Sequence, residues 1–116
     1  MQVKFFCDLY ISECWKNKKR QIMERIKKNK IFPDTYIITL SQGEQNNLEF
    51  FQGILLRQHI FDNSELFVIG IADGYGEALQ IVHDITGKVY QETGDADLRR
   101  YIQIRQEEYE ETERER

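Results

Sequence analysis

The sequence predicts an α+β domain built on a mixed four-stranded sheet. The expected element order is strand, helix, strand, strand, strand, helix, followed by a C-terminal helix or an edge strand. Three observations predict this class. Apolar residues alternate in short stretches near the N-terminus and in the middle of the chain, a period that is typical of strands. Residues 11–29 and 75–92 repeat their apolar residues with the helical period. Residues 66–72 are apolar on both faces, as in a central strand covered on both sides.

The length and composition fit one ordinary domain. The chain has 116 residues, of which 41% are apolar and 31% charged, and this balance excludes disorder across the whole chain. We expect a single domain over residues 1–104 and a charged tail or frayed helix end over residues 105–116. No apolar run approaches the roughly 20 residues that cross a bilayer, so no membrane partner is expected. The N-terminus carries no secretory signal pattern, which favours a cytoplasmic, reduced protein with Cys7 and Cys14 as small buried thiols.

The N-terminal elements follow from a change of period. Residues 3–7 alternate as a short strand. From about residue 11 the apolar side chains share one helical face, which carries Ile11, Trp15, Ile22 and Ile26. Lys19 falls inside this apolar arc, so its ammonium group must reach past apolar neighbours to water.

The next three strands are expected at residues 35–40, 48–56 and 66–72. Turn residues at 42–46 make the first two of them an antiparallel pair. The strand–helix–strand unit at the N-terminus predicts that the first and second strands are parallel neighbours. Strands two, three and four are then expected to form a meander.

Glycines and an aspartate mark the boundaries of the C-terminal elements. Gly74 and Gly76 turn the chain into the helix at residues 75–92, and Gly94 is a natural stop for it. Asp97 can cap a third helix, with a short edge strand at residues 98–102 as the competing interpretation.

Both faces of the expected sheet are apolar. We place Tyr36, Ile38 and Phe50 on one face, and on the other Phe6, Ile37, Phe51, Leu55, Phe67, Ile69 and Ile71. Two helices cover such a sheet thinly, so either the C-terminal segment or a second copy of the chain must complete the cover. This reasoning makes Phe51, Leu55 and Phe67 candidate contacts in a homo-oligomer.

Charge is unevenly distributed along the chain. Residues 1–30 carry nine Lys and Arg against three Asp and Glu, a balance of +6, whereas residues 31–116 carry seven against seventeen, a balance of −10. On the first helix Lys16, Arg20 and Lys27 group on one side. The leading hypothesis is therefore a non-enzymatic, homo-oligomeric interaction module whose contact surfaces are this basic helix and the acidic C-terminus. The chain is not basic overall, so nucleic acid is not an expected partner.

An alternative hypothesis is a small metal- or nucleotide-dependent enzyme. Asp8 and Asp73 each end an expected strand, and if these two strands are parallel neighbours the carboxylates meet at one sheet edge and can hold Mg²⁺. Gly74 and Gly76 lie in a strand-to-helix turn, where phosphates bind in nucleotide folds. The turn has neither a GxGxxG nor a P-loop pattern, and no metal or other cofactor is expected.

Three segments carry a resemblance to known sequences. They are the runs FFCDLYIS at residues 5–12, NLEFF at 47–51 and VIGIADGY at 68–75. Together they resemble a group of small hypothetical proteins of anaerobic Firmicutes that has no assigned activity. The resemblance spans about residues 1–104, implies a bacterial, cytoplasmic, stand-alone domain, and transfers no site residue.

Overall fold

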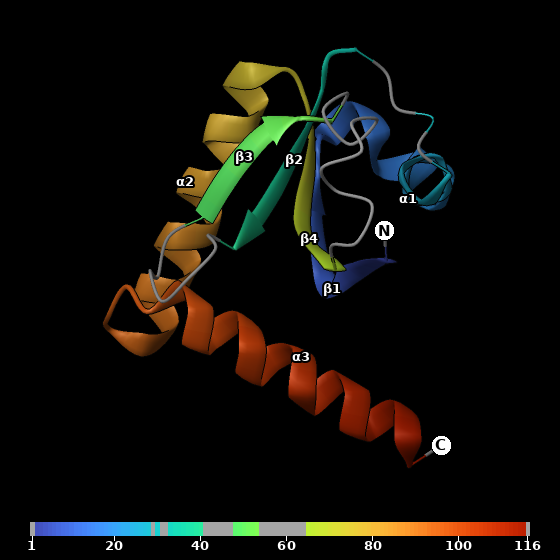
Figure 1. Cartoon of the computed structure of the whole chain (residues 1–116). Coiled ribbons are helices and arrows are strands. Elements are labelled where there is room, and N and C mark those ends of the chain that lie inside the picture. Colours follow the sequence, from blue (N-terminus) through green and yellow to red (C-terminus); the bar gives the residue numbers. More distant parts are fainter. Residues whose placement is uncertain (1, 29, 31–32, 41–47, 54–64, 116) are drawn as a thin grey trace.

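The computed structural model describes residues 2–28, 30, 33–40, 48–53 and 65–115 of the chain. In sequence order its elements are β1 (Gln2–Ile11), the 3-10 helix η1 (Glu13–Lys18), α1 (Lys19–Lys27), β2 (Thr35–Leu40), β3 (Leu48–Gln52), β4 (Glu65–Asp73), α2 (Tyr75–Thr93) and α3 (Leu98–Arg114) (Figure 1). The predicted α+β class with a mixed four-stranded sheet is confirmed.

The strands of this sheet lie in the order β1-β4-β2-β3. β4 is parallel to β1 and antiparallel to β2, and β2 is antiparallel to β3. The predicted parallel pairing of the first and second strands is therefore wrong, as is the predicted meander. The reason is that β4 is apolar on both faces, so an inner position covered by helices on both sides suits it best. The prediction that residues 66–72 form a central strand is confirmed.

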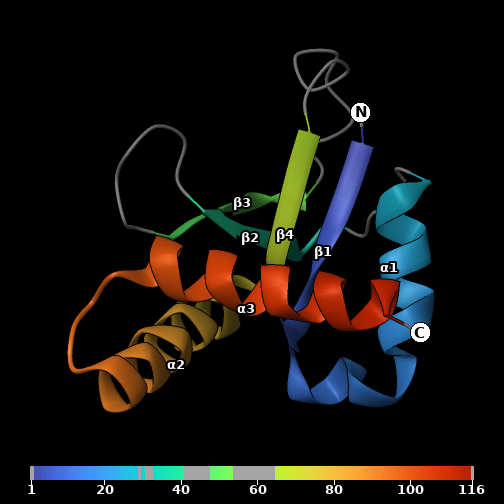
Figure 2. The same cartoon turned by 90° about the horizontal axis from the view of Figure 1, so that it is seen from below.

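The pairing of β1 with β4 contains a large irregularity. Phe5 pairs with Val68, but the next pair joins Tyr10 to Gly70, so residues 6–9 lie opposite Ile69 alone. A bulge of this kind leaves backbone groups without a partner in the ladder. One of them, the Cys7 amide, donates a hydrogen bond to Oε1 of Gln106 on α3 at 2.8 Å. α3 thus supplies a partner for one backbone group of the bulge, and it crosses the sheet at the level of β4 and β1 (Figure 2).

A second irregularity changes the faces of the sheet. Along β2, Ile38 pairs with Gly70 and Thr39 with Val68, which leaves Ile69 as an extra residue in β4. Because the side-chain period of a strand is two, one extra residue moves the preceding side chains to the other face. Ile69 and Phe67 therefore pack with Ile38, as does Phe6, and not with Ile37 as the sequence analysis predicted.

Each face of the sheet has its own apolar cluster. α1 covers one face and α2 and α3 cover the other (Figures 1 and 2). The buried residues on the α1 side are Leu9, Ile22, Ile26, Ile37, Leu66, Val68 and Ile71. Those on the α2 and α3 side are Phe6, Ile38, Ile69, Ala72, Ala78, Ile81, Ile85, Val89, Leu98 and Ile102. α3 thus supplies cover within one copy of the chain.

The helix boundaries follow local chemistry. α2 ends at Gly94, whose φ of 78° is the left-handed conformation that glycine adopts readily. Asp97 caps α3, since its Oδ1 accepts a hydrogen bond from the Arg100 amide at 3.1 Å. The helix interpretation of residues 98–102 is confirmed, the edge-strand alternative is wrong, and the helix continues through residue 114. The first helix begins later than predicted, because β1 continues to Ile11 and η1 precedes α1.

Candidate functional site

The carboxyl ends of β1 and β4 meet at one edge of the sheet, beside the N-terminus of α2. β1 and β4 are parallel neighbours, as the alternative hypothesis required, and Ile11 pairs with Ile71 near their ends. The residue that reaches Asp73 is Ser12, which directly follows β1. The buried Ser12 hydroxyl accepts a hydrogen bond from the Asp73 amide at 2.7 Å and donates one to Oε2 of Glu77 at 2.8 Å.

Asp8 does not take part in this edge. It lies within β1 rather than at its end, because the strand continues past the bulge. Its carboxylate instead accepts hydrogen bonds from Arg105 of α3, at 2.9 Å from Nε and 3.5 Å from Nη2. The expected meeting of the Asp8 and Asp73 carboxylates is therefore not formed.

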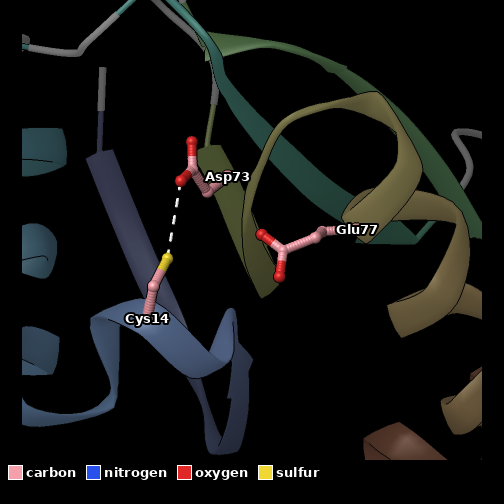
Figure 3. A group of neighbouring side chains, drawn as sticks. All are labelled: Cys14, Asp73 and Glu77. Carbon is pink, nitrogen blue, oxygen red and sulfur yellow. Dashed lines mark hydrogen bonds between the residues drawn. The ribbon is translucent and has the colours of Figure 1, made fainter.

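A thiol and two carboxylates converge at this edge instead. Cys14 of η1, Asp73 at the end of β4 and Glu77 in the first turn of α2 place one ligand atom each within 4.8 Å of one another (Figure 3). The Cys14 thiol donates a hydrogen bond to Oδ2 of Asp73 at 3.4 Å. Desolvation, the hydrogen bond to Asp73 and the negative charges of Asp73 and Glu77 together raise the pKa of the Cys14 thiol.

This arrangement has a limited chemical repertoire. A thiolate and two carboxylates are ligands for a divalent transition metal, and these three come from separate elements. The thiol, however, donates a hydrogen bond to the Asp73 carboxylate (Figure 3), an interaction that requires the protonated thiol and not the thiolate that a metal binds. A raised thiol pKa also opposes a nucleophilic role, because the thiolate is the reactive form.

In the turn that carries Gly74 and Gly76, backbone amides already have hydrogen-bond partners within the protein. Gly74 has a φ of 101°, a conformation that glycine adopts readily and other residues rarely do. Its amide donates a hydrogen bond to the carbonyl oxygen of Asp34 at 2.9 Å. Gly76 is the second residue of α2 and has no positive φ. With the Asp73 amide bound to Ser12 and two carboxylates beside the helix end, the turn is poorly suited to phosphate.

The predicted basic contact residues lie on η1 and α1. Lys16 forms an ion pair with Glu13 at 2.7 Å, and Arg20 is exposed. Lys27 forms an ion pair with Glu24 at 3.6 Å, and its Nζ lies 5.7 Å from the ring centre of Phe5.

The predicted apolar contact residues are partly used inside the fold. Phe67 is half-buried and packs edge-on against Phe6, with ring centres 6.2 Å apart. Phe51 is half-buried beside the cluster on the α1 side. Leu55 lies outside the described residues. Phe51 and Phe67 therefore contribute to the two clusters of the fold itself.

Sequence reasoning missed three residues of the strand edge. Cys14 was expected as a buried thiol, and neither Ser12 nor Glu77 was expected at this edge. Cys14 is in fact exposed, Cys7 is half-buried, and both are free. The available signal was the spacing of Asp73 and Glu77, four residues apart across a strand-to-helix turn, which places both carboxylates at one helix end.

Comparison of the chain with protein-family models, with curated proteins and with solved structures finds no match. The resemblance to small proteins of Firmicutes thus stays a prediction. In the part of the chain that the structure describes, no helix combines the length and the apolar character needed to cross a membrane.

Proposed function

We propose that this protein is a non-enzymatic interaction module that associates with a second copy of itself through oppositely charged helices. The basic surface consists of exposed side chains on η1, on α1 and just after it: Lys16, Lys18, Arg20, Lys27 and Lys28. The acidic end consists of exposed side chains at the C-terminal end of α3: Glu107, Glu108, Glu111, Glu113 and Glu115.

The observation that carries the proposal is the placement of these two charged surfaces. In Figure 1 α1 lies against the sheet on the side away from α2. α3 contacts β1 as far as Glu110, which forms an ion pair with Lys4, and its last turn ends beyond the sheet. Residues 106–115 contain six Glu and a single Arg. Both surfaces thus face outward with unbalanced charge, and each has the sign that the other attracts.

The proposal does not depend on an uncovered sheet face. α1 on one side, and α2 with α3 on the other, cover the apolar clusters within one copy. Charge complementarity is therefore the stronger support for self-association. A two-fold dimer would use each contact twice, the basic surface of one copy against the acidic end of the other.

The test is a charge exchange. Four charge reversals change the sign of each surface. The variant Lys18→Glu/Arg20→Glu/Lys27→Glu/Lys28→Glu makes the basic surface acidic. The variant Glu107→Lys/Glu111→Lys/Glu113→Lys/Glu115→Lys makes the acidic end basic. We expect the wild type to be dimeric at low salt and each variant alone to be monomeric, because both of its surfaces then have the same sign. An equimolar mixture of the two variants should form heterodimers, because both contacts become attractive again.

Light scattering after size exclusion measures these masses, at low salt and at about 0.5 M salt, where screening shortens the range of exposed charges to a few ångström. Gln80→Glu/Asp84→Lys on α2 serves as the control that alters charge elsewhere. A wild type that stays monomeric at 1 mM protein in low salt contradicts the proposal. So does a dimer that neither charge reversal disturbs.

A further inference from the structure

A groove lies beside the irregular part of β1, apart from the strand edge described above. It has a volume of about 520 Å³, which lies within the range of small-molecule sites. Its lining comes from β1, from η1 and α1, and from α2: Asp8, Leu9, Tyr10, Ile11, Lys16, Lys19 and Lys88. In the described part of the chain β1 is an edge strand, so this groove lies along a sheet margin.

The charges that line the groove are mostly positive. Three of the seven lining residues are lysines, and each comes from a different helical element. The one acidic lining residue, Asp8, is held by Arg105 at 2.9 Å, so much of its charge is compensated. These three lysines line one groove of a chain whose net charge is −4.

Lys19 gives the groove a partly enclosed cation. The sequence places this residue in the apolar arc of the first helix, and the structure shows its side chain half-buried at the start of α1. Half-burial restricts the side chain and reduces the water around it, so an anion that reaches the groove meets a less screened charge. Lys16 also forms an ion pair with Glu13, and Lys88 is exposed on α2.

Tyr10 adds a neutral donor. Desolvation, with smaller contributions from the charges of Asp8, Glu92 and Asp84, raises the pKa of its phenol. A tyrosine hydroxyl is protonated at neutral pH even at its ordinary pKa, so it can donate a hydrogen bond. Negative charge from Asp84 and Glu92 lies on the α2 side of the groove. A large anion would meet this charge, so the groove favours a compact anion near the three lysines.

We propose that this groove binds a small, multiply charged anion of the phosphate class, such as a diphosphate or a phosphorylated metabolite. Lysine binds phosphate as a point charge without the planar geometry that arginine imposes, and three separate lysines suit a compact polyanion better than a single carboxylate. Lysines also protect edge strands from pairing with other chains, but that role requires neither a cavity nor a half-buried cation. The site concerns a small ligand and goes beyond the self-association proposed above.

Inorganic pyrophosphate is the probe, and backbone amide NMR spectra of the full chain are the readout. We expect saturable shifts at residues 8–11, 16, 19 and 88. Lys19→Gln/Lys88→Gln should bind about tenfold more weakly. The matched control, Lys18→Gln/Lys28→Gln, removes the same charge from exposed positions outside the groove and should bind within about twofold of the wild type. Urea midpoints of both variants verify that they fold.

Three results would overturn the proposal. The first is the absence of saturable shifts. The second is equal weakening in the control variant, which would show that pyrophosphate responds only to overall charge. The third is displacement of pyrophosphate by a peptide of residues 105–115 that binds more tightly at the same amides. That result would make the groove the docking place of α3 from a second copy. The self-association test changes Lys18, Arg20, Lys27 and Lys28, none of which lines the groove, so the two proposals fail independently.

Discussion

The hydrogen bond between α3 and the irregular part of β1 makes a quantitative prediction. Gln106 is 7% exposed, and its Oε1 accepts from the Cys7 amide at 2.8 Å. Gln106→Met keeps the length of the side chain but removes the acceptor, which leaves the amide without a partner. An unpaired buried donor costs about 1–3 kcal/mol, and the half-buried position of Cys7 favours the lower part of that range. We expect the free energy of unfolding to fall by about 1–2 kcal/mol.

Urea unfolding followed by circular dichroism measures this loss, and hydrogen exchange at the Cys7 amide locates it. Gln103→Met is the matched control, because Gln103 lies exposed on the same helix and should change stability by about 0.5 kcal/mol or less. Gln106→Glu retains the acceptor oxygen, so protection of the Cys7 amide should persist there. If Gln106→Met matches Gln103→Met in stability and leaves the exchange rate at Cys7 unchanged, the reasoning about the bulge is refuted.

Three further predictions concern titration, reactivity and the strand edge. Desolvation and a 2.6 Å hydrogen bond to Glu92 raise the pKa of Tyr101 to about 12, so the fold favours the neutral phenol. The stability that this group contributes is complete below pH 10 and is lost as the pH rises toward 12. Absorbance at 295 nm should show that the last tyrosine to ionise disappears in Tyr101→Phe, whereas the raised pKa of Tyr10 is retained. Cys14 should react slowly with iodoacetamide at pH 8 and faster in Asp73→Asn, because the substitution removes a negative charge that disfavours the thiolate. Peptide mass spectrometry measures the two alkylation rates, and equal rates would contradict this prediction. Ser12→Ala should lower the free energy of unfolding by about 1–3 kcal/mol, since the Asp73 amide loses its partner, and an unchanged thermal midpoint would argue against that bond.

Local sequence signals predicted the elements well. The strand expected at residues 35–40 is β2, Thr35–Leu40, and the helix expected at 75–92 is α2, Tyr75–Thr93. Both predictions rest on a clear apolar period in the sequence. The glycines that flank α2, Gly74 and Gly94, have positive φ angles, and these mark the two ends of the helix. Asp97 as the cap of α3 belongs to the same kind of signal.

The pairing of strands depended on information that is not local. An extra residue at Ile69 and the bulge over residues 6–9 decide which side chains share a face, and neither leaves a pattern in the sequence. The same bulge carries β1 past Asp8 and brings Ser12 to Asp73, which is 61 residues away. The parallel pairing of β1 with β4 was only a condition of the alternative hypothesis, and the residues that meet at this edge follow from the register.

The bond between Cys7 and Gln106 also bears on the order of folding. It joins residues 99 positions apart, so it closes a loop of most of the chain. Long loops lose more entropy on closure and slow the rate at which a native topology is reached. β1 pairs with β4 alone among the described strands and is fastened by α3, so its docking should follow the association of β2 with β3 and β4. Substitutions at this junction should therefore accelerate unfolding and leave the refolding rate nearly constant.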